Sequence, residues 1–298
     1  MATFFDRCEF LATPRVIMSQ KPDVSQSTST GHKLGHAHHL DRHYYALQAE
    51  YEETLRSAGF KSGWHILDAG SGNGLFLPLM SELLGASGHI TAIDFAPENI
   101  EAVKELVAGR NLACPVDARV GDITALPYQD NRFDGMWSAN VSQYLTDAQL
   151  LRVMTEFRRV VKPGGLIVVK EVDISVWQFQ PQNPRLMWRL LECMQDDTQL
   201  SGAMRGTRMP IWFRRAGLTE IWNRTTLAER RHPLKRIEHD YIRGNLEFLS
   251  NLAATQDLPK SDLMEWKGVA ATPDVLINDP DFCYRELYAL TGGRVPIQ

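Results

Sequence analysis

The stretch His65-Ile-Leu-Asp-Ala-Gly-Ser-Gly-Asn-Gly74 decides the fold of this 298-residue chain. It starts as an apolar strand, and glycines then alternate with other residues until an apolar helical pattern begins at Leu75. Glycines at this spacing let the backbone turn sharply and approach a ligand closely. The start of the following helix carries free N–H groups and a partial positive charge, which suit a carboxylate or phosphate. The stretch therefore predicts a site for a nucleotide-like ligand.

Strand-like and helical patterns alternate around this stretch. The strand-like runs are 64–69, 89–94, 118–120, 133–138 and 166–172, followed later by 218–227 and 282–290. The helical runs are 39–58, 75–84, 97–108, 148–160 and 233–252. Alternating strands and helices with short connections are typical of a doubly wound parallel sheet. The sequence therefore predicts an α/β fold of this type.

Composition excludes several classes of protein. The net charge of −4 and a pI near 6.1 give no general attraction to nucleic acid or to an anionic membrane. No apolar run approaches the length of about 18 residues that spans a bilayer. The cysteines are scattered without metal or redox spacing, at positions 8, 114, 193 and 283. Together with the absence of a secretory pattern, these features predict a cytoplasmic protein without a bound metal.

The glycine pattern separates two kinds of nucleotide site. A dinucleotide site has G-x-G-x-x-G, whereas this chain has D-x-G-x-G-x-G with the acid in front. Asp94 ends the second strand, 94 − 74 = 20 residues beyond Gly74, and can bind both hydroxyls of a ribose. A nicotinamide-dependent oxidoreductase remains the less favoured alternative.

Five segments in order resemble the class I S-adenosylmethionine-dependent methyltransferases, in particular the small-molecule branch of ubiquinone/menaquinone methyltransferase-like enzymes. The segments are 68–74, 94–99, 121–127, 133–140 and 158–165. The resemblance covers roughly 44–172. It implies a Rossmann-like, mostly parallel sheet of seven strands with an antiparallel last strand, an N-terminal helical arm and a helical cap.

The resemblance also implies a set of residues that bind S-adenosylmethionine and its product S-adenosylhomocysteine. They are Asp68, Gly70, Ser71, Gly72, Gly74, Asp94, Phe95, Asn99, Asp122, Ile123, Asn140, Tyr44 and Tyr45. Asp94 is expected on the ribose hydroxyls, Phe95 beside the adenine, and Asp122 at the adenine amino group. Tyr44 and Tyr45 lie on the segment that covers the methionine end in relatives, where they either line the site or pack in the core.

The group that moves the proton is less certain in this chain than in its relatives. Many relatives carry histidine after the fourth strand, where this chain has Gln143 and Tyr144. The candidate catalytic residues are Tyr144, His43 and Asp173. Tyr144, with an ordinary pKa near 10, is equally a packing aromatic. Asp173, like Glu171, ends the fifth strand and either handles a proton or pairs with an arginine.

His43 belongs to a histidine cluster at the start of the first helix. The other members are His32, His36, His38 and His39. Close histidines can bind metal or act as bases, although in a mobile arm they are more often simply solvated. His39 and His43 are spaced i, i+4 on the helix and are the stronger candidates of the cluster.

The predicted organisation is a flexible arm (1–38), a cofactor-binding core (39–175), a first cap segment (176–217) and the last strands (218–298) with an inserted helical cap at about 233–272. Aromatic residues at 177, 179, 188, 212 and 213 are expected in the cap, which favours a small organic substrate with aromatic or isoprenoid bulk. The predicted reaction is methyl transfer by in-line displacement, driven mainly by positioning. A member that binds the cofactor without transferring methyl is the alternative, and the acceptor atom and oligomeric state stay open.

Overall fold

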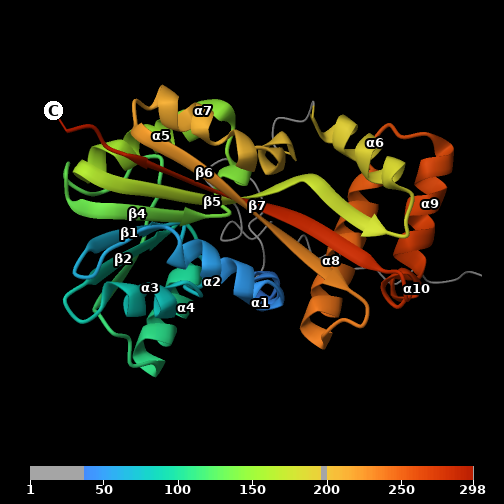
Figure 1. The fold of residues 1–298 in the computed structure, drawn as a ribbon, viewed down its shortest axis with the longest axis horizontal. Helices are drawn as coiled ribbons and strands as arrows, with labels where there is room; N and C mark the ends of the chain where they lie inside the picture. The colour runs from blue at the N-terminus through green and yellow to red at the C-terminus, as the bar shows by residue number, and fades with distance from the viewer. Residues whose placement is uncertain (1–36, 196–199, 298) are drawn as a thin grey trace, which may run out of the picture.

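The computed structural model describes residues 37–195 and 200–297 (Figure 1). Most of the predicted arm, with His32 and His36, lies outside the described residues, and so do the side chains of His38 and His39. None of the helices in the described part of the chain is both long and apolar enough to cross a membrane.

Seven strands form one sheet with the order β3-β2-β1-β4-β5-β7-β6. The strands are β1 (His65–Ala69), β2 (His89–Asp94), β3 (Val116–Val120), β4 (Phe133–Ala139), β5 (Val161–Gln180), β6 (Thr219–Arg231) and β7 (Cys283–Arg294). β1 to β5 pair in parallel, whereas β7 runs antiparallel to both β5 and β6. The predicted fold class is confirmed.

Helices cover both faces of the sheet. They are α1 (Ala37–Ala46), α2 (Gln48–Arg56), α3 (Leu77–Leu84), α4 (Pro97–Gly109), α5 (Asp147–Val160), α6 (Pro184–Gln195), α7 (Pro210–Arg215), α8 (Arg236–Ala253), α9 (Lys260–Ala271) and α10 (Pro273–Ile277). Short 3-10 turns are η2 (Ser142–Tyr144), η3 (Leu200–Met204) and η4 (Gly206–Arg208). Figure 1 shows α2, α3 and α4 below the sheet and α5 and α7 above it. This arrangement leaves the carboxyl ends of the parallel strands free for a ligand.

Two boundaries differ from the sequence prediction. The helix expected over 39–58 is two helices that break at Leu47, whose backbone is not helical (φ −128°, ψ 21°). β5 is much longer than the run 166–172, because it stays paired with β7 as far as Gln180, opposite Cys283. The apolar pattern marks only the part of β5 that is buried between helices.

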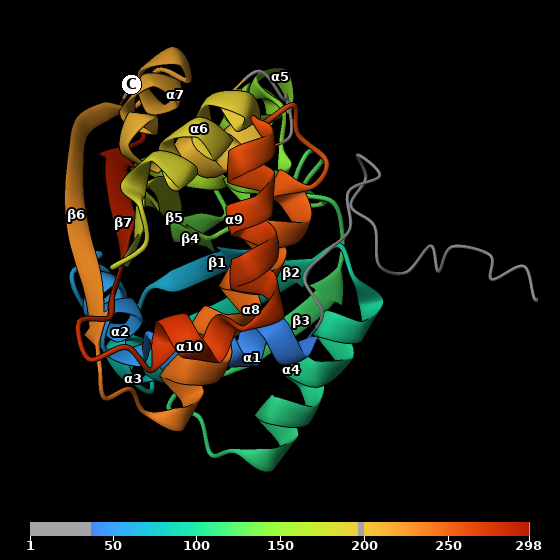
Figure 2. The same cartoon turned by 90° about the vertical axis from the view of Figure 1, so that its right-hand side faces the viewer.

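The long strands β5, β6 and β7 leave the parallel sheet and carry the cap. In Figure 1 they run to the right-hand half of the molecule, where α6, α8, α9 and α10 pack on them. Figure 2 shows these helices standing in front of the strand ends. One buried apolar cluster connects α1 and α2 with β7 and the cap helices. The cap is therefore built on the sheet itself.

The aromatic residues expected in the cap divide between two places. Trp177 and Phe179 pack in the cap cluster, and Trp188 is largely exposed. Trp212 and Phe213 pack instead with residues of α5, on the sheet face away from α2, α3 and α4. The cap prediction was wrong for these two residues, because α7 returns the chain to the core.

Candidate active site

The glycine loop follows β1 and leads into α3. Gly70 and Gly72 have positive φ (78° and 54°), which favours glycine. The Gly70 N–H donates to the Ile93 carbonyl (2.8 Å), and the Gly72 N–H donates to Asp94 Oδ2 (2.8 Å). A Cβ on Gly70 would also clash with the Val141 side chain. The loop is therefore held against the end of β2 and against the turn after β4.

Asp94 connects the end of β2 to this loop. Its Oδ1 accepts hydrogen bonds from the Ala96 N–H (3.0 Å) and from Asn99 Nδ2 (3.0 Å). Burial raises the pKa of Asp94, while these donors and the Gly72 N–H lower it. Phe95, next in the chain, is 40% exposed. Asp94, the residue predicted to bind the ribose, thus also fixes the glycine loop, which carries other residues predicted to bind the cofactor.

Asp68 has a buried carboxylate with one oxygen left over. Its side chain is almost fully buried, and Oδ2 has no hydrogen-bond partner. Burial, and then the neighbouring charge of Asp94, raise the pKa of Asp68 to about 8. An unpaired buried carboxyl is costly. A cationic ligand at the glycine loop would supply the missing partner.

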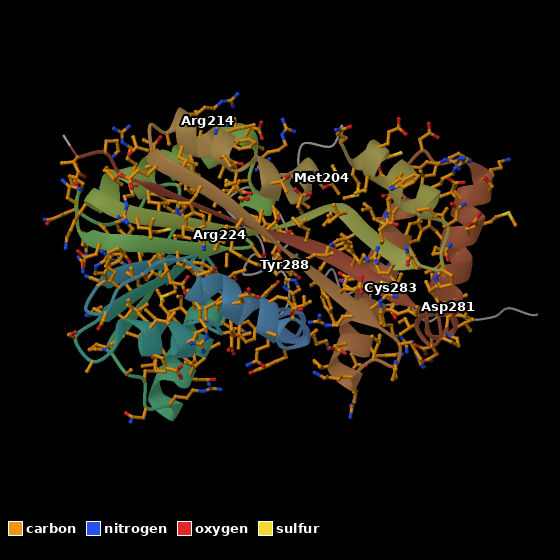
Figure 3. All side chains as sticks on the ribbon, viewed as in Figure 1. Met204, Arg214, Arg224, Asp281, Cys283 and Tyr288 are labelled. Carbon is orange, nitrogen blue, oxygen red and sulfur yellow. The ribbon has the colours of Figure 1, made fainter. Side chains whose placement is uncertain are left out.

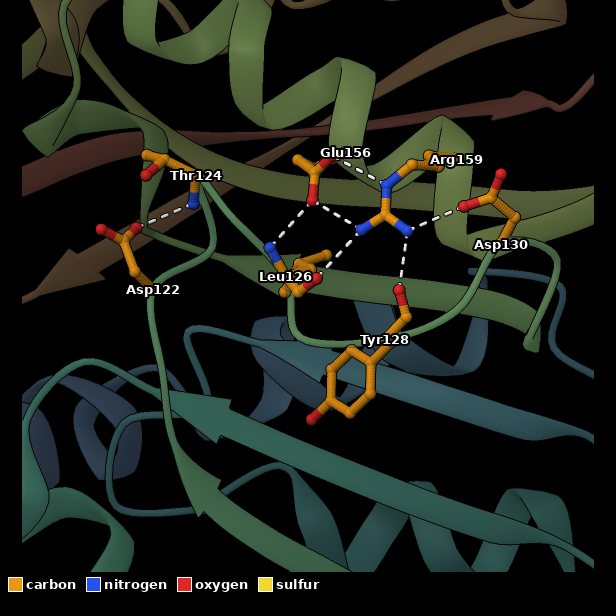
Figure 4. Close-up of polar contacts among 7 residues, drawn as sticks. All are labelled: Asp122, Thr124, Leu126, Tyr128, Asp130, Glu156 and Arg159. Carbon is orange, nitrogen blue, oxygen red and sulfur yellow. Dashed lines mark hydrogen bonds and ion pairs between the residues drawn. The ribbon is translucent and has the colours of Figure 1, made fainter.

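The loop after β3 carries Asp122 and Ile123 and is held by α5 (Figure 4). Asp122 Oδ1 accepts from the Thr124 N–H (2.8 Å). Arg159 donates to the carbonyls of Tyr128 (2.7 Å) and Leu126 (3.0 Å), and Glu156 accepts from the Leu126 N–H (2.8 Å). Arg159 and Glu156 also pair with each other. The sequence analysis quoted Arg159 within a motif but missed this anchoring role.

Asn140 follows β4 directly and has a left-handed conformation (φ 58°). Its Oδ1 accepts from Lys170 Nζ (2.8 Å), and its Nδ2 donates to the Tyr51 hydroxyl (3.2 Å). Lys170 Nζ lies 3.6 Å from the centre of the Tyr51 ring and 3.8 Å from that of Tyr288. Burial lowers the pKa of Lys170 well below its ordinary value. A buried, aromatic-lined amine therefore lies beside the end of β4.

Glu286 forms the other half of this buried cluster, on β7. Its Oε2 accepts from the hydroxyls of Tyr241 (2.9 Å) and Tyr284 (2.6 Å), and Oε1 accepts from Tyr288. Figure 3 places Tyr288 near the middle of the molecule, where β7 passes from the sheet toward the cap. Lys170, Glu286 and Tyr51 are not among the residues predicted from the sequence. The available signal was a charged residue inside each of two otherwise buried strands.

The candidate catalytic residues Tyr144 and His43 lie in different surroundings. Tyr144 is in η2, where burial, followed by the charge of Glu171, raises its pKa to about 12. Its phenol stays protonated near neutral pH, which disfavours a role as base. A ring nitrogen of His43 lies 2.6 Å from the Tyr51 hydroxyl. Tyr44 is buried in the core cluster, whereas Tyr45 is 44% exposed.

Glu171 and Asp173 lie at the end of the buried part of β5 and differ in how their carboxylate oxygens are hydrogen-bonded. Asp173 Oδ1 accepts from Ser175, and Oδ2 accepts from the Thr207 N–H (3.0 Å) and hydroxyl (2.7 Å). Glu171 Oε1 accepts from the N–H groups of Val141 (3.1 Å) and Ser142 (2.8 Å), but Oε2 has no partner. Both oxygens of Asp173 have partners, in β5 and in η4, and Glu171 is the one of the two with an unpaired oxygen.

The central part of the chain matches a known family. Residues 66–165 match the profile described as a methyltransferase domain. Demethylmenaquinone methyltransferase of Staphylococcus aureus (strain MRSA252) is 32% identical over 126 residues, which are 41% of this chain and 48% of that protein. Residues 66–165 form a class I S-adenosylmethionine-dependent methyltransferase domain. The whole chain spans about half the length of the curated relatives that it matches.

Solved structures agree with the methyltransferase domain in fold. A protein from Bacillus halodurans C-125 aligns with a TM-score of 0.53 at 14% identity, over 84% of this chain and 100% of that one. Phosphoethanolamine N-methyltransferase 2 of Haemonchus contortus, in complex with S-adenosyl-L-methionine, aligns with a TM-score of 0.51 at 15% identity, over 92% of this chain and 59% of that one. At such identities these likenesses show the fold alone.

The residues of the methyltransferase domain fit S-adenosylmethionine, the cofactor of this class. The unpaired, buried Oδ2 of Asp68 suits a positively charged amino group. The glycines of the loop, with their positive φ values, let a ligand approach the backbone beside Asp94. The partly exposed Phe95 offers an aromatic ring next to it. Among the described residues, no cluster of three or more His, Cys, Asp and Glu side chains could hold a metal ion.

Proposed function

We propose that this protein transfers the methyl group of S-adenosylmethionine to a small organic metabolite. The observation that carries the proposal is the unpaired oxygen of Asp68 beside a glycine loop that Asp94 holds in place. When bound, S-adenosylmethionine supplies a methyl group that its sulfonium already makes electrophilic. The protein therefore contributes mainly by holding donor and acceptor in line, an effect worth roughly 7–11 kcal/mol of barrier.

In this proposal, groups at the strand ends hold the two parts of the donor. The carboxylate of Asp68 pairs with the amino group of the methionine part, and Asp94 binds the ribose hydroxyls. Phe95 and Ile123 flank the adenine, and Asp122 binds its amino group. The Arg159–Glu156 pair supports this last contact, because it fixes the loop on which Asp122 lies.

The acceptor is proposed to enter between the N-terminal helices and the cap. The cluster of buried side chains there is mainly apolar and aromatic, with contributions from α1, α2, α6 and α8. Side chains of this kind favour an organic acceptor with aromatic or isoprenoid bulk. The name of the Staphylococcus aureus relative, a demethylmenaquinone methyltransferase, supports the same class. On this basis residues 39–175 bind the donor, while 176–217 and about 233–272 cover the acceptor.

The test is incubation with methyl-labelled S-adenosylmethionine and an extract of the source cells, followed by mass spectrometry. We expect a labelled small molecule together with an equal amount of S-adenosylhomocysteine. The matched control is Gly72→Val, because a side chain at this positive-φ position of the loop is expected to block the donor. Donor binding without labelled product would contradict methyl transfer. Binding of a nicotinamide dinucleotide in place of the donor would overturn the whole assignment.

A further inference from the structure

Glu171 is a buried carboxylate whose hydrogen bonds are unevenly divided. Its side chain is 2% exposed, and one oxygen accepts from two backbone N–H groups while the other accepts from none. Buried carboxylate oxygens are normally satisfied, so an unpaired one calls for an explanation. Asp173, two residues further on the same strand, shows the ordinary case, because both of its oxygens have partners.

The position of Glu171 connects it to the glycine loop. Its carboxylate holds the N–H groups of Val141 and Ser142, which start the turn after β4. The side chain of Val141 contacts Gly70, where even a Cβ would clash. Glu171 is therefore separated from the loop under the donor by a single residue of this turn. The carboxyl ends of β4 and β5, where ligands bind in such sheets, meet at the same place.

We infer that Glu171 is the proton acceptor of the methyl transfer, with its free Oε2 directed at the reaction centre. This inference rests on the proposed function and adds that the acceptor arrives with a proton on the atom to be methylated, as a hydroxyl or an amine does. A lone pair on the acceptor atom X forms the new bond to the methyl carbon. The X–H bond breaks with its electron pair remaining on X, and the proton moves to Glu171 Oε2. The sulfur–methyl bond breaks with its electrons remaining on sulfur.

The surroundings of Glu171 suit this task near neutral pH. Burial raises the pKa of Glu171 to about 7, against the opposing effects of the Ser142 N–H and the charge of Lys170. From η2, Tyr144 faces the same carboxylate as a neutral phenol. Arg205 lies between η3 and η4 and interacts electrostatically with Glu171. It also forms an ion pair with Asp147 of α5 (3.0 Å). A base with a pKa near the working pH is the most effective kind.

The inference can be tested before the acceptor is known, by calorimetric titration with S-adenosylmethionine and S-adenosylhomocysteine from about pH 6 to pH 8.5. Only the first ligand carries the permanent sulfonium charge at the reaction centre. The amino and carboxylate groups are common to both ligands. Titration of Asp68, which is proposed to bind the amino group, therefore cancels in the ratio of the two affinities.

We expect the preference for S-adenosylmethionine over S-adenosylhomocysteine to rise about tenfold across this range in the wild type, as Glu171 becomes charged. Glu171→Gln should make the ratio independent of pH, whereas the control Asp173→Asn should keep the wild-type dependence. A flat ratio in the wild type, or an unchanged slope in Glu171→Gln, would overturn the inference. A flat wild-type series overturns the inference even if a variant does not fold. Failure of both ligands to bind would instead contradict the proposed function.

Discussion

Two regions of the molecule bury carboxylates in opposite ways. At the cap junction, the carboxylate of Glu286 accepts from three tyrosine hydroxyls and has no free oxygen. Near the carboxyl ends of the parallel strands, Asp68 and Glu171 each have one buried oxygen without a partner. All three side chains are buried, so the difference does not come from exposure. It supports the proposal that Glu286 serves the fold, whereas Asp68 and Glu171 serve a ligand.

The largest effect is expected when the satisfied carboxylate is removed. Glu286→Leu leaves the hydroxyls of Tyr241, Tyr284 and Tyr288 without their shared acceptor, each at a cost of about 1–3 kcal/mol. We expect the free energy of unfolding in urea to fall by about 3 kcal/mol or more. The control Glu286→Gln keeps an acceptor oxygen and should lose less. An unchanged unfolding midpoint for the leucine variant would contradict the claim that Glu286 stabilises the fold.

Asp94→Ala should weaken binding of S-adenosylmethionine at least about 100-fold, or about 2.7 kcal/mol, as measured by calorimetry. The variant loses both the expected ribose contact and the acceptor that holds the Gly72 N–H. Asp94→Asn, which keeps the size and removes the charge, separates these two contributions. The expected change in unfolding free energy is smaller than for Glu286→Leu. Wild-type affinity in the alanine variant would contradict the site.

Arg159→Ala tests whether the loop after β3 is positioned from a distance. The change removes donors to the carbonyls of Leu126 and Tyr128, so we expect the affinity for S-adenosylmethionine to fall about tenfold and hydrogen exchange over 122–130 to speed up. Arg158→Ala is the matched control, because Arg158 donates to the Ala216 carbonyl, which is outside this loop. Equal losses in the two variants would argue against the anchoring role.

Asp68→Asn should have the smallest effect and opposite signs for stability and binding. The pKa of Asp68 rises from 3.8 to about 8 on folding, so the folded state holds its proton more tightly and loses stability as pH rises from about 4 to 8. The neutral variant should therefore be the more stable protein at pH 8, while it binds S-adenosylmethionine more weakly. A variant less stable than the wild type at pH 8 would show that the charge is already compensated.

The glycine loop and the end of β2 could be predicted from the sequence because they are local features, whereas their role in donor binding stays a prediction. The glycine loop directly follows β1, and Asp94 is the last residue of β2, so the neighbouring sequence is enough to place both. The cluster of Tyr51, Lys170 and Glu286 could not be predicted, because more than 100 residues separate consecutive members. The pairing of β5 with β7 brings Lys170 and Glu286 together, and the packing of α2 against these strands adds Tyr51. The choice between Glu171 and Asp173 was equally out of reach. The difference between the two residues depends on backbone N–H groups of the turn after β4 and on Thr207 of η4. No pattern of side chains in the sequence predicts these hydrogen bonds.

The central claim is that the unpaired carboxylate oxygen at the glycine loop belongs to the donor's site. The most direct measurement is a crystal structure of the protein with S-adenosylmethionine bound. We predict that Asp68 Oδ2 then lies within hydrogen-bond distance of the donor's amino group, directly or through one water, while the three tyrosine contacts of Glu286 are unchanged. A bound donor that leaves Asp68 Oδ2 without a partner would contradict the claim.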